Sequence, residues 1–223
     1  MKKIPFDIIG FDLDGTLVDT SSDLAAAVNH VLASIGRPLL SQAEVKRHIG
    51  GGAKMMLQQG LEATGGIPRD DFKPLYRQML QYYESNVSVH STPFDGALEV
   101  LDELDFLDVR YAVVTNKFEG LAVKLLTDLG LAHRMGCILG ADSLGKENAK
   151  PSGAPIFEMV KRCGGGKAAY VGDSTYDVMA ARNAGVPSVA CSFGFLLGPV
   201  EDLGADAVID HFDELLTALR RMH

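Results

Sequence analysis

Cysteine is scarce in this sequence, and no two cysteines have the close spacing that a metal or redox site needs. Cys137, Cys163 and Cys191 stand far apart, and none belongs to a CxxC motif. Zinc sites and redox couples typically use such a motif because it holds two thiols side by side. We therefore expect three reduced cysteines that fill space in the protein interior.

Positive charge is also in short supply. Lysine and arginine number 21 against 29 aspartate and glutamate residues, which gives a formal net charge of -8. The resulting negative field opposes broad docking on nucleic acid or on an anionic membrane, so we expect neither as a partner. An anionic ligand would need local cations to overcome this field.

Long unbroken hydrophobic runs are absent as well. The uncharged stretch 183–200 is interrupted by glycines and prolines, so it does not predict a membrane-spanning helix. Near the N-terminus, Asp7 and Asp12 break the apolar residues before they reach the length of a signal peptide. These features predict a cytoplasmic protein.

The overall composition is that of an ordinary globular protein. Of the 223 residues, 47% are hydrophobic and 22% are charged, which suffices for a sizeable core. The length lies between one large domain and two small ones. One core with an inserted module fits this length.

The first third of the chain predicts one buried strand followed by helices. Residues 6–11 read as a short strand that leads directly into the aspartate-rich segment 12–16. A capped helix is expected to start at Ser22, and helical patterns follow at 41–48, 53–63 and 70–85. We therefore expect an all-helical module at 17–90, inserted into a core made of 1–16 and 91–223, with chain crossings near Leu17 and Ser91.

The rest of the chain alternates between helices and strands. Helices are expected from Ala97, Glu119 and Ala154 and over 212–221, and strands at 111–114, 137–139, 168–171, 188–191 and 207–209. Repeated βα units predict an α/β fold with a doubly wound parallel sheet. The common order of its first five strands is third, second, first, fourth, fifth.

Polar side chains follow several of the predicted strands. They are Asp12, Asp14, Thr115, Asn116, Asp173 and Asp177, with Lys150 ahead of a helix. Ligands of open α/β sheets bind beyond the carboxyl ends of the strands, where the winding direction reverses. We therefore expect these side chains to meet in one crevice.

In that order, the segments 12–16 (DLDGT), 114–116 (VTN), 150–151 (KP) and 172–177 (GDSTYD) resemble the four motifs of the haloacid dehalogenase superfamily of phosphotransferases. The helical insertion resembles the C1 cap of that superfamily, placed on its Rossmann-like core. Segments 17–19, 114–117, 142–144 and 172–174 are similar to bacterial phosphoglycolate phosphatases. This resemblance implies an enzyme that acts on phosphate esters.

The resemblance also implies a role for each motif residue. Asp12 is implied as the nucleophile that forms an aspartyl-phosphate, and Asp14 as the general acid and base. Asp12, the backbone carbonyl of Asp14 and Asp173 would hold Mg²⁺. Asp177 is expected to lie one layer further from the substrate and to position Lys150 or a water molecule.

The remaining motif residues are implied to bind the substrate. Lys150 supplies a second positive charge, and Thr115 hydrogen-bonds the phosphate oxygens. Asn116 is expected to contact the phosphate or a water molecule. Haloacid dehalogenases share the nucleophile but lack the second aspartate, because a halide needs no proton, so Asp14 favours phosphoryl chemistry.

The implied reaction is Mg²⁺-dependent hydrolysis of a small phosphorylated metabolite, with 2-phosphoglycolate, which yields glycolate and phosphate, as the expected substrate. A sugar phosphomutase, a pyrophosphatase or a nucleotidase of the same superfamily stays open. So does a phospho-acceptor signalling module, because receiver domains also place an aspartate, a hydroxyl residue and a lysine around Mg²⁺. The chain is expected to be a monomer or a homodimer.

Two features of the predicted site stay open at this stage. Glycolate carries a carboxylate, so a cation from the helical insertion is required, and Lys54 or Arg47 beside the glycines 50–52 could serve. The segment 192–195 does not match the family pattern. Its effect on the pocket is not predicted.

Overall fold

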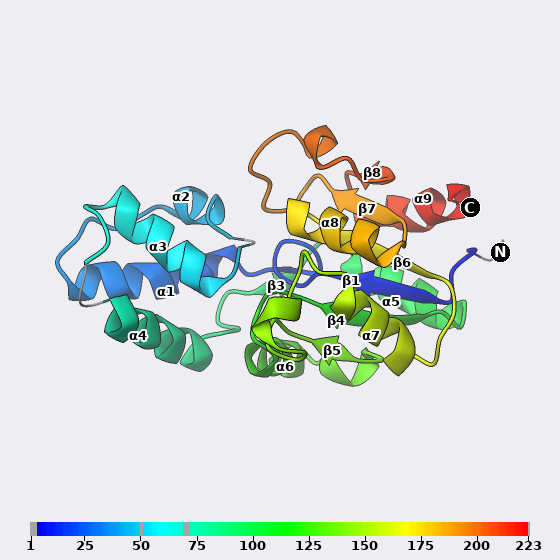
Figure 1. The fold of residues 1–223 in the computed structure, drawn as a ribbon, viewed down its shortest axis with the longest axis horizontal. Helices are drawn as coiled ribbons and strands as arrows, with labels where there is room; N and C mark the ends of the chain where they lie inside the picture. The colour runs from blue at the N-terminus through cyan, green and yellow to red at the C-terminus, as the bar shows by residue number, and fades with distance from the viewer. Residues whose placement is uncertain (1–3, 50, 69–71, 223) are drawn as a thin grey trace.

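The computed structural model describes residues 4–49, 51–68 and 72–222, which contain a six-stranded sheet and a group of helices to one side of it (Figure 1). Every strand pair in this sheet is parallel, in the order β5-β4-β1-β6-β7-β8. The strands are β1 (Ile8–Phe11), β4 (Arg110–Val114), β5 (Ile138–Leu139), β6 (Ala168–Gly172), β7 (Ser188–Cys191) and β8 (Ala207–Ile209). The predicted strand order is confirmed.

Helices cover both faces of the sheet, because side chains of the central strands alternate between two hydrophobic clusters. Ile8 and Tyr170 belong to the cluster of α7 and α8, whereas Ile9 and Val171 belong to that of α5, α6 and α9. These helices are α5 (Ala97–Phe106), α6 (Glu119–Asp128), α7 (Ala154–Arg162), α8 (Thr175–Ala184) and α9 (Leu215–Arg221), and 3₁₀ turns span Ala132–Arg134, Lys146–Asn148, Val200–Leu203 and Phe212–Glu214. Burial on both faces is typical of parallel sheets, and the predicted α/β doubly wound class is confirmed.

The predicted helical segment is present as a group of helices beside the sheet (Figure 1). It contains α1 (Ser21–Ser34), α2 (Gln42–Lys46), α3 (Ala53–Ala63) and α4 (Phe72–Ser85). The start predicted for the last of these, residue 70, lies outside the described residues. α1 begins at Ser21, one residue before the predicted Ser22, and its N-cap residue Thr20 forms no side-chain capping hydrogen bond. The Asp19 carboxylate accepts a hydrogen bond from the Ser21 amide over 3.0 Å.

Two short strands connect the helices to the sheet, and the sequence predicted neither. β2 (Val18–Asp19) pairs antiparallel with β3 (Thr92–Pro93). Strands of this length show no alternation of apolar and polar residues, and proline within one argues against a strand. The pair lies where the chain was expected to cross between the core and the insertion.

Among the described residues, no helix combines the length and the apolar character needed to cross a bilayer. The fold also determines where the motif residues lie. The three central strands β4, β1 and β6 end immediately before Thr115, Asp12 and Asp173. The site therefore lies on the edge of the sheet that faces the helical group.

Candidate active site

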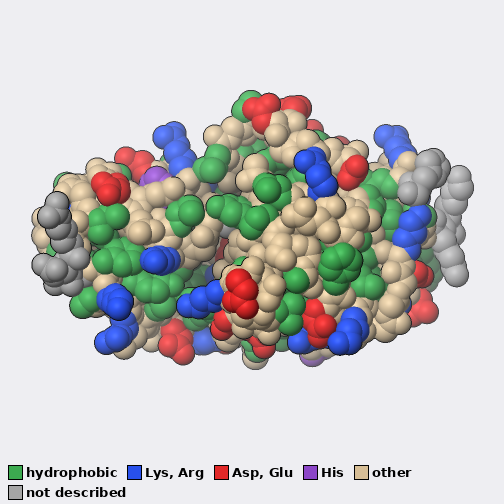
Figure 2. All heavy atoms as spheres, in the orientation of Figure 1, with side chains coloured by type: hydrophobic (Ala, Val, Ile, Leu, Met, Phe, Trp, Pro, Cys, Tyr) green, Lys and Arg blue, Asp and Glu red, His purple; other side chains and the backbone are tan. Residues whose placement is uncertain are grey.

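A cavity of about 320 Å³ lies between the strand ends and the helical group. Figure 2 shows the surface hollowed at the junction of these two parts, with hydrophobic side chains around the hollow. Five of the predicted residues line the cavity, namely Asp12, Asp14, Thr115, Asn116 and Lys150. Asp173 lines a neighbouring cavity of about 290 Å³, which opens between the 192–199 segment and the helical group.

Lys150 forms ion pairs with two of the predicted carboxylates. Its ammonium nitrogen Nζ lies 2.9 Å from Oδ1 of Asp12 and 2.6 Å from Oδ1 of Asp177. The Lys150 side chain is 1% exposed, so these two carboxylates rather than water stabilise its charge. The backbone amide of Leu13 donates a second hydrogen bond to Asp12.

Asp173 is held by groups from two other segments. Thr16 Oγ1 donates to its Oδ1 over 3.1 Å, and the backbone amide of Phe195 donates to its Oδ2 over 2.6 Å. Gly15 has φ 88°, and a side chain there would place Cβ 2.2 Å from Asp173 Oδ2. The segment 192–195, which the sequence left unexplained, therefore helps to fix this carboxylate.

Asp177 is engaged from several sides at the start of α8. Its Oδ2 accepts hydrogen bonds from the backbone amides of Asp173 and Ser174, at 3.2 and 2.9 Å, while its Oδ1 meets Lys150. Asp177 thus contacts both Lys150 and the turn that carries Asp173.

Three buried carboxylates lie close enough to share a cation. One oxygen each from Asp12, Asp173 and Asp177 lies within 4.8 Å of the others. Burial raises the pKa of Asp12 to about 6, although Lys150 opposes the shift, and burial together with the neighbouring carboxylates raises the pKa of Asp173 well above its ordinary value. A hard divalent cation prefers such oxygen ligands and would relieve their repulsion, so the donor set fits one.

The raised pKa of Asp12 predicts an unusual pH dependence in metal-free buffer. Its pKa is about 6 in the folded protein against 3.8 for the free side chain, so the folded state binds the proton more tightly. The contribution of Asp12 to stability therefore falls as pH rises from about 4 to about 6, by roughly 3 kcal/mol. The raised pKa of Asp173 contributes a loss of its own that remains in Asp12→Asn, so thermal melts across this range should show a larger fall in melting temperature for the wild type than for Asp12→Asn; parallel curves would contradict the prediction.

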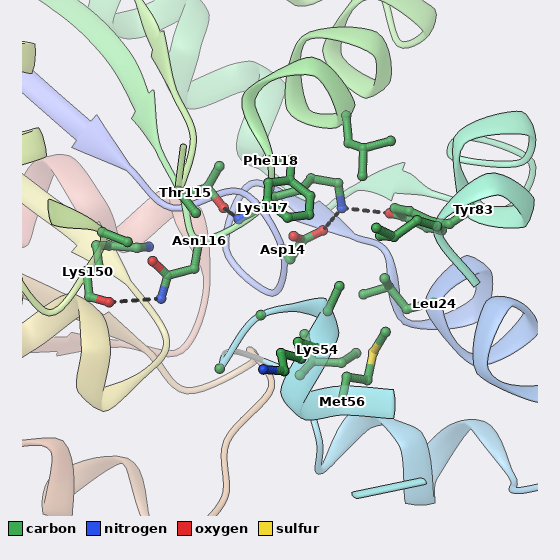
Figure 3. Close-up of a pocket in the computed structure, with 18 of the residues that line it drawn as sticks. Asp14, Leu24, Lys54, Met56, Tyr83, Thr115, Asn116, Lys117, Phe118 and Lys150 are labelled. Atoms are coloured by element: carbon green, nitrogen blue, oxygen red, sulfur yellow. Dashed lines mark hydrogen bonds and ion pairs between the residues drawn. The ribbon is translucent and has the colours of Figure 1, made fainter. Parts of the chain in front are cut away.

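Asp14 points into the same cavity but belongs to a different network (Figure 3). Its Oδ1 accepts hydrogen bonds from Lys117 Nζ and from Thr20 Oγ1, each over 2.7 Å. Lys117 Nζ also lies 2.6 Å from the hydroxyl oxygen of Tyr83 on α4. No role was predicted for Lys117, although it belongs to segment 114–117, and none was predicted for Tyr83.

Thr115 and Asn116 lie between the two networks. Lys117 donates its backbone amide to Thr115 Oγ1 over 3.2 Å, and Asn116 Nδ2 donates to the Lys150 carbonyl over 3.2 Å. Tyr170, which the sequence also missed, donates its hydroxyl to the Val114 carbonyl over 2.5 Å and lies 3.2 Å from Lys150 Nζ. These contacts connect the turn after β4 to Lys150.

The two candidate cations of the helical insertion face different cavities. Lys54 lines the cavity that contains Asp12, whereas Arg47 lines the cavity that contains Asp173. Gly50 lies outside the described residues. Gly52 has φ 87°, and a Cβ there would lie 3.8 Å from the Asn116 carbonyl oxygen, so this loop approaches the core at the active site.

Comparison with known proteins identifies this arrangement. A family model described as haloacid dehalogenase-like hydrolase matches residues 9–191, which contain every motif residue named above. The chain belongs to this family. The family predicted from the motifs is confirmed, and with it the prediction of an enzyme.

Relatives of this hydrolase share most of its length. A phosphoglycolate phosphatase from Agrobacterium fabrum is 38% identical to this chain, and the match covers 94% of this chain and 90% of the relative. A phosphoglycolate phosphatase from Caulobacter vibrioides is 39% identical, and the match covers 92% of this chain and 86% of the relative. A crystal structure described as a predicted phosphoglycolate phosphatase from Haemophilus somnus superposes with a TM-score of 0.88 at 32% identity, covering 96% of this chain and 97% of that one. The likeness therefore extends over both the sheet and the helical insertion.

Proposed function

We propose that this hydrolase cleaves a small phosphate ester through a phosphorylated Asp12, with Mg²⁺ as its cofactor. The observation that supports it best is the position of the Asp12 carboxylate, which lines the main cavity, contacts Lys150 and lies beside Asp173. A carboxylate can attack a phosphate dianion only where cations compensate the charge of both. This cluster supplies one cation and the ligands for another.

The proposed metal ligands are Asp12, Asp173 and the backbone carbonyl of Asp14. When bound, Mg²⁺ offsets the negative charge that Asp12 and the substrate phosphate bring together. Thr16 and Phe195 hold Asp173 in place for this role. Asp177 stays with Lys150, to which it is already paired.

The proposed reaction has two displacements at phosphorus. A carboxylate oxygen of Asp12 attacks phosphorus, the bond to the ester oxygen breaks, and Asp14 gives its proton to that oxygen. Water then attacks the phosphorylated Asp12, passes a proton to Asp14, and releases phosphate and the free carboxylate. Both aspartates line the same cavity, as such a sequence requires.

The remaining residues are proposed to stabilise charge and to exclude water. Lys150 and Thr115 meet the phosphate oxygens that gain negative charge, and Asn116 positions the phosphate or a water molecule. We further propose that segment 17–90 acts as a cap over a core of 1–16 and 91–223. Closure of the cap would remove bulk water from the reacting atoms.

We propose 2-phosphoglycolate as the substrate, because the relatives that share most of the chain are named phosphoglycolate phosphatases. Its carboxylate needs a cation in the cavity. Lys54 is well placed, because it projects from α3 into the cavity that Asp12 lines (Figure 3). Arg47 faces the other cavity, so the structure favours Lys54 of the two residues.

Lys54→Met should therefore change substrate preference. We expect kcat/KM for 2-phosphoglycolate to fall by about 5-fold, which corresponds to an exposed ion pair of about 1 kcal/mol, while kcat/KM for ethyl phosphate stays within about 2-fold. Arg47→Met is the matched control, with no selective effect expected. A selective loss in Arg47→Met, or an equal loss on both esters in Lys54→Met, would contradict the assignment.

The proposed function is tested by phosphate release from a panel of compounds, each with Mg²⁺ and with a chelator. The panel contains 2-phosphoglycolate, β-glucose 1-phosphate, pyrophosphate and nucleotides. We expect metal-dependent release, fastest from 2-phosphoglycolate. Release from another compound would replace the substrate, isomerised sugar phosphate without free phosphate would indicate a mutase, and a stable phosphoprotein without turnover would indicate a phospho-acceptor module.

A further inference from the structure

Lys117 lies at the centre of a network that joins three distant parts of the chain. Asp14 follows β1, Lys117 follows β4, and Tyr83 lies near the end of α4 in the helical insertion. Lys117 Nζ lies 2.7 Å from Asp14 Oδ1 and 2.6 Å from the Tyr83 hydroxyl, and Figure 3 shows the ammonium group between the two. The network therefore crosses from the core to the insertion.

The contacts of Lys117 with Asp14 and Tyr83 are buried. The Lys117 side chain is 5% exposed, and Tyr83 is buried as well. Burial opposes the charge of Lys117, yet Asp14 and Tyr83 outweigh this effect and raise its pKa above the ordinary value, while burial raises the pKa of Tyr83 to about 12. An ammonium group in such a place must keep its partners, because water cannot replace them.

Both ends of the helical insertion converge on Asp14. Thr20, which precedes α1 at the start of the insertion, donates its hydroxyl to Asp14 Oδ1 over 2.7 Å. Tyr83, near the end of the insertion, reaches the same oxygen through Lys117. The orientation of the Asp14 carboxylate thus depends on how the insertion sits against the core.

We propose that Lys117 and Tyr83 are positioning residues that hold Asp14 where it can protonate the leaving oxygen. Because Tyr83 belongs to the helical insertion, the position of Asp14 then depends on how the insertion packs against the core. The inference rests on the proposed function, in which Asp14 is the acid. Neither residue needs to contact the reacting phosphate. Lys117 fixes the carboxylate, and Tyr83 fixes Lys117 from the insertion.

The leaving group provides a test that a purely structural role would not pass. An alkoxide needs a proton as it leaves, whereas p-nitrophenolate leaves readily without one. The ratio kcat/KM reports on the step in which the leaving group departs. A misplaced acid should therefore slow alkyl phosphates and spare p-nitrophenyl phosphate.

The experiment compares three substrates: 2-phosphoglycolate, ethyl phosphate and p-nitrophenyl phosphate, all with Mg²⁺. For Lys117→Met we expect kcat/KM to fall by about 10²-fold on both alkyl esters, and for Tyr83→Phe by about 10-fold, because general acid catalysis contributes 10²-fold or more. On p-nitrophenyl phosphate the loss should stay below about 3-fold. Lys117→Arg, which keeps the charge, should recover part of the alkyl activity.

Two variants serve as matched controls. Tyr82→Phe removes the hydroxyl of the neighbouring tyrosine, which stacks on His30, and Lys124→Met removes an exposed ammonium group that pairs with Asp128. Both should keep wild-type ratios between substrates, and melts followed by circular dichroism should show that every variant is folded.

The possible results separate the proposals. Equal losses on alkyl and aryl esters, or no loss in Lys117→Met, would overturn the positioning role. A loss confined to 2-phosphoglycolate would also overturn it, because Lys117 would then bind the substrate carboxylate. Wild-type enzyme that releases phosphate from none of the three would instead contradict the proposed function.

Discussion

Asp12→Asn should abolish phosphate release while leaving the protein folded. An amide oxygen is a poor nucleophile and cannot form the aspartyl-phosphate, so we expect kcat with 2-phosphoglycolate to fall by at least about 10³-fold, or roughly 4 kcal/mol of barrier. Turnover with Mg²⁺ present measures the effect. Asp128→Asn, at an exposed position on α6, is the matched control and should keep wild-type activity.

The melting temperature of Asp12→Asn shows whether its loss of activity comes from the missing nucleophile or from unfolding. Burial and the neighbouring carboxylates penalise the charged form of Asp12, so replacing it should leave the thermal midpoint in metal-free buffer at pH 7 equal to or above that of the wild type. An inactive variant that melts early would leave the loss explained by unfolding. An active Asp12→Asn enzyme would exclude Asp12 as the nucleophile.

Lys150→Met should have the next largest effect, on activity and stability together. Its ammonium group is the partner of Asp12 and Asp177, and removing one member of a buried ion pair typically costs about 3 kcal/mol or more. Removing a charge that stabilises the transition state should lower kcat by about 10³-fold. Melts by circular dichroism and turnover with Mg²⁺ measure the two effects.

Magnesium and a conservative variant make the Lys150 prediction specific. The loss of the ammonium group leaves the acidic cluster without a counter-ion, so Mg²⁺ should raise the melting temperature of Lys150→Met more than that of the wild type. Lys150→Arg keeps the charge and should be more stable than Lys150→Met. A folded Lys150→Met enzyme with wild-type turnover would contradict the role given to this lysine.

The sheet and the motif residues could be predicted from the sequence because short local patterns indicate both. Buried runs such as 6–11 and 168–171 ended in polar residues, and the topology of parallel sheets then placed Asp12, Thr115 and Asp173 together. In the structure Lys150 contacts both Asp12 and Asp177.

Other parts of the site had no local signal. Phe195 holds Asp173 through a backbone amide, which every residue type except proline could supply. Tyr83 reaches Lys117 across 34 positions of the chain, and only the packing of α4 against the core makes them neighbours. The β2 and β3 pair was missed because each strand is too short to show a pattern.

The most direct test of the central claim is to look for the phosphoryl group on Asp12. Enzyme turning over 2-phosphoglycolate with Mg²⁺ is quenched in acid, digested and examined by mass spectrometry, with Asp12→Asn as the control. The account predicts one added phosphoryl group on the peptide that contains Asp12 and none in the control. Turnover with no phosphorylated peptide, or with the phosphoryl group on another residue, would contradict it.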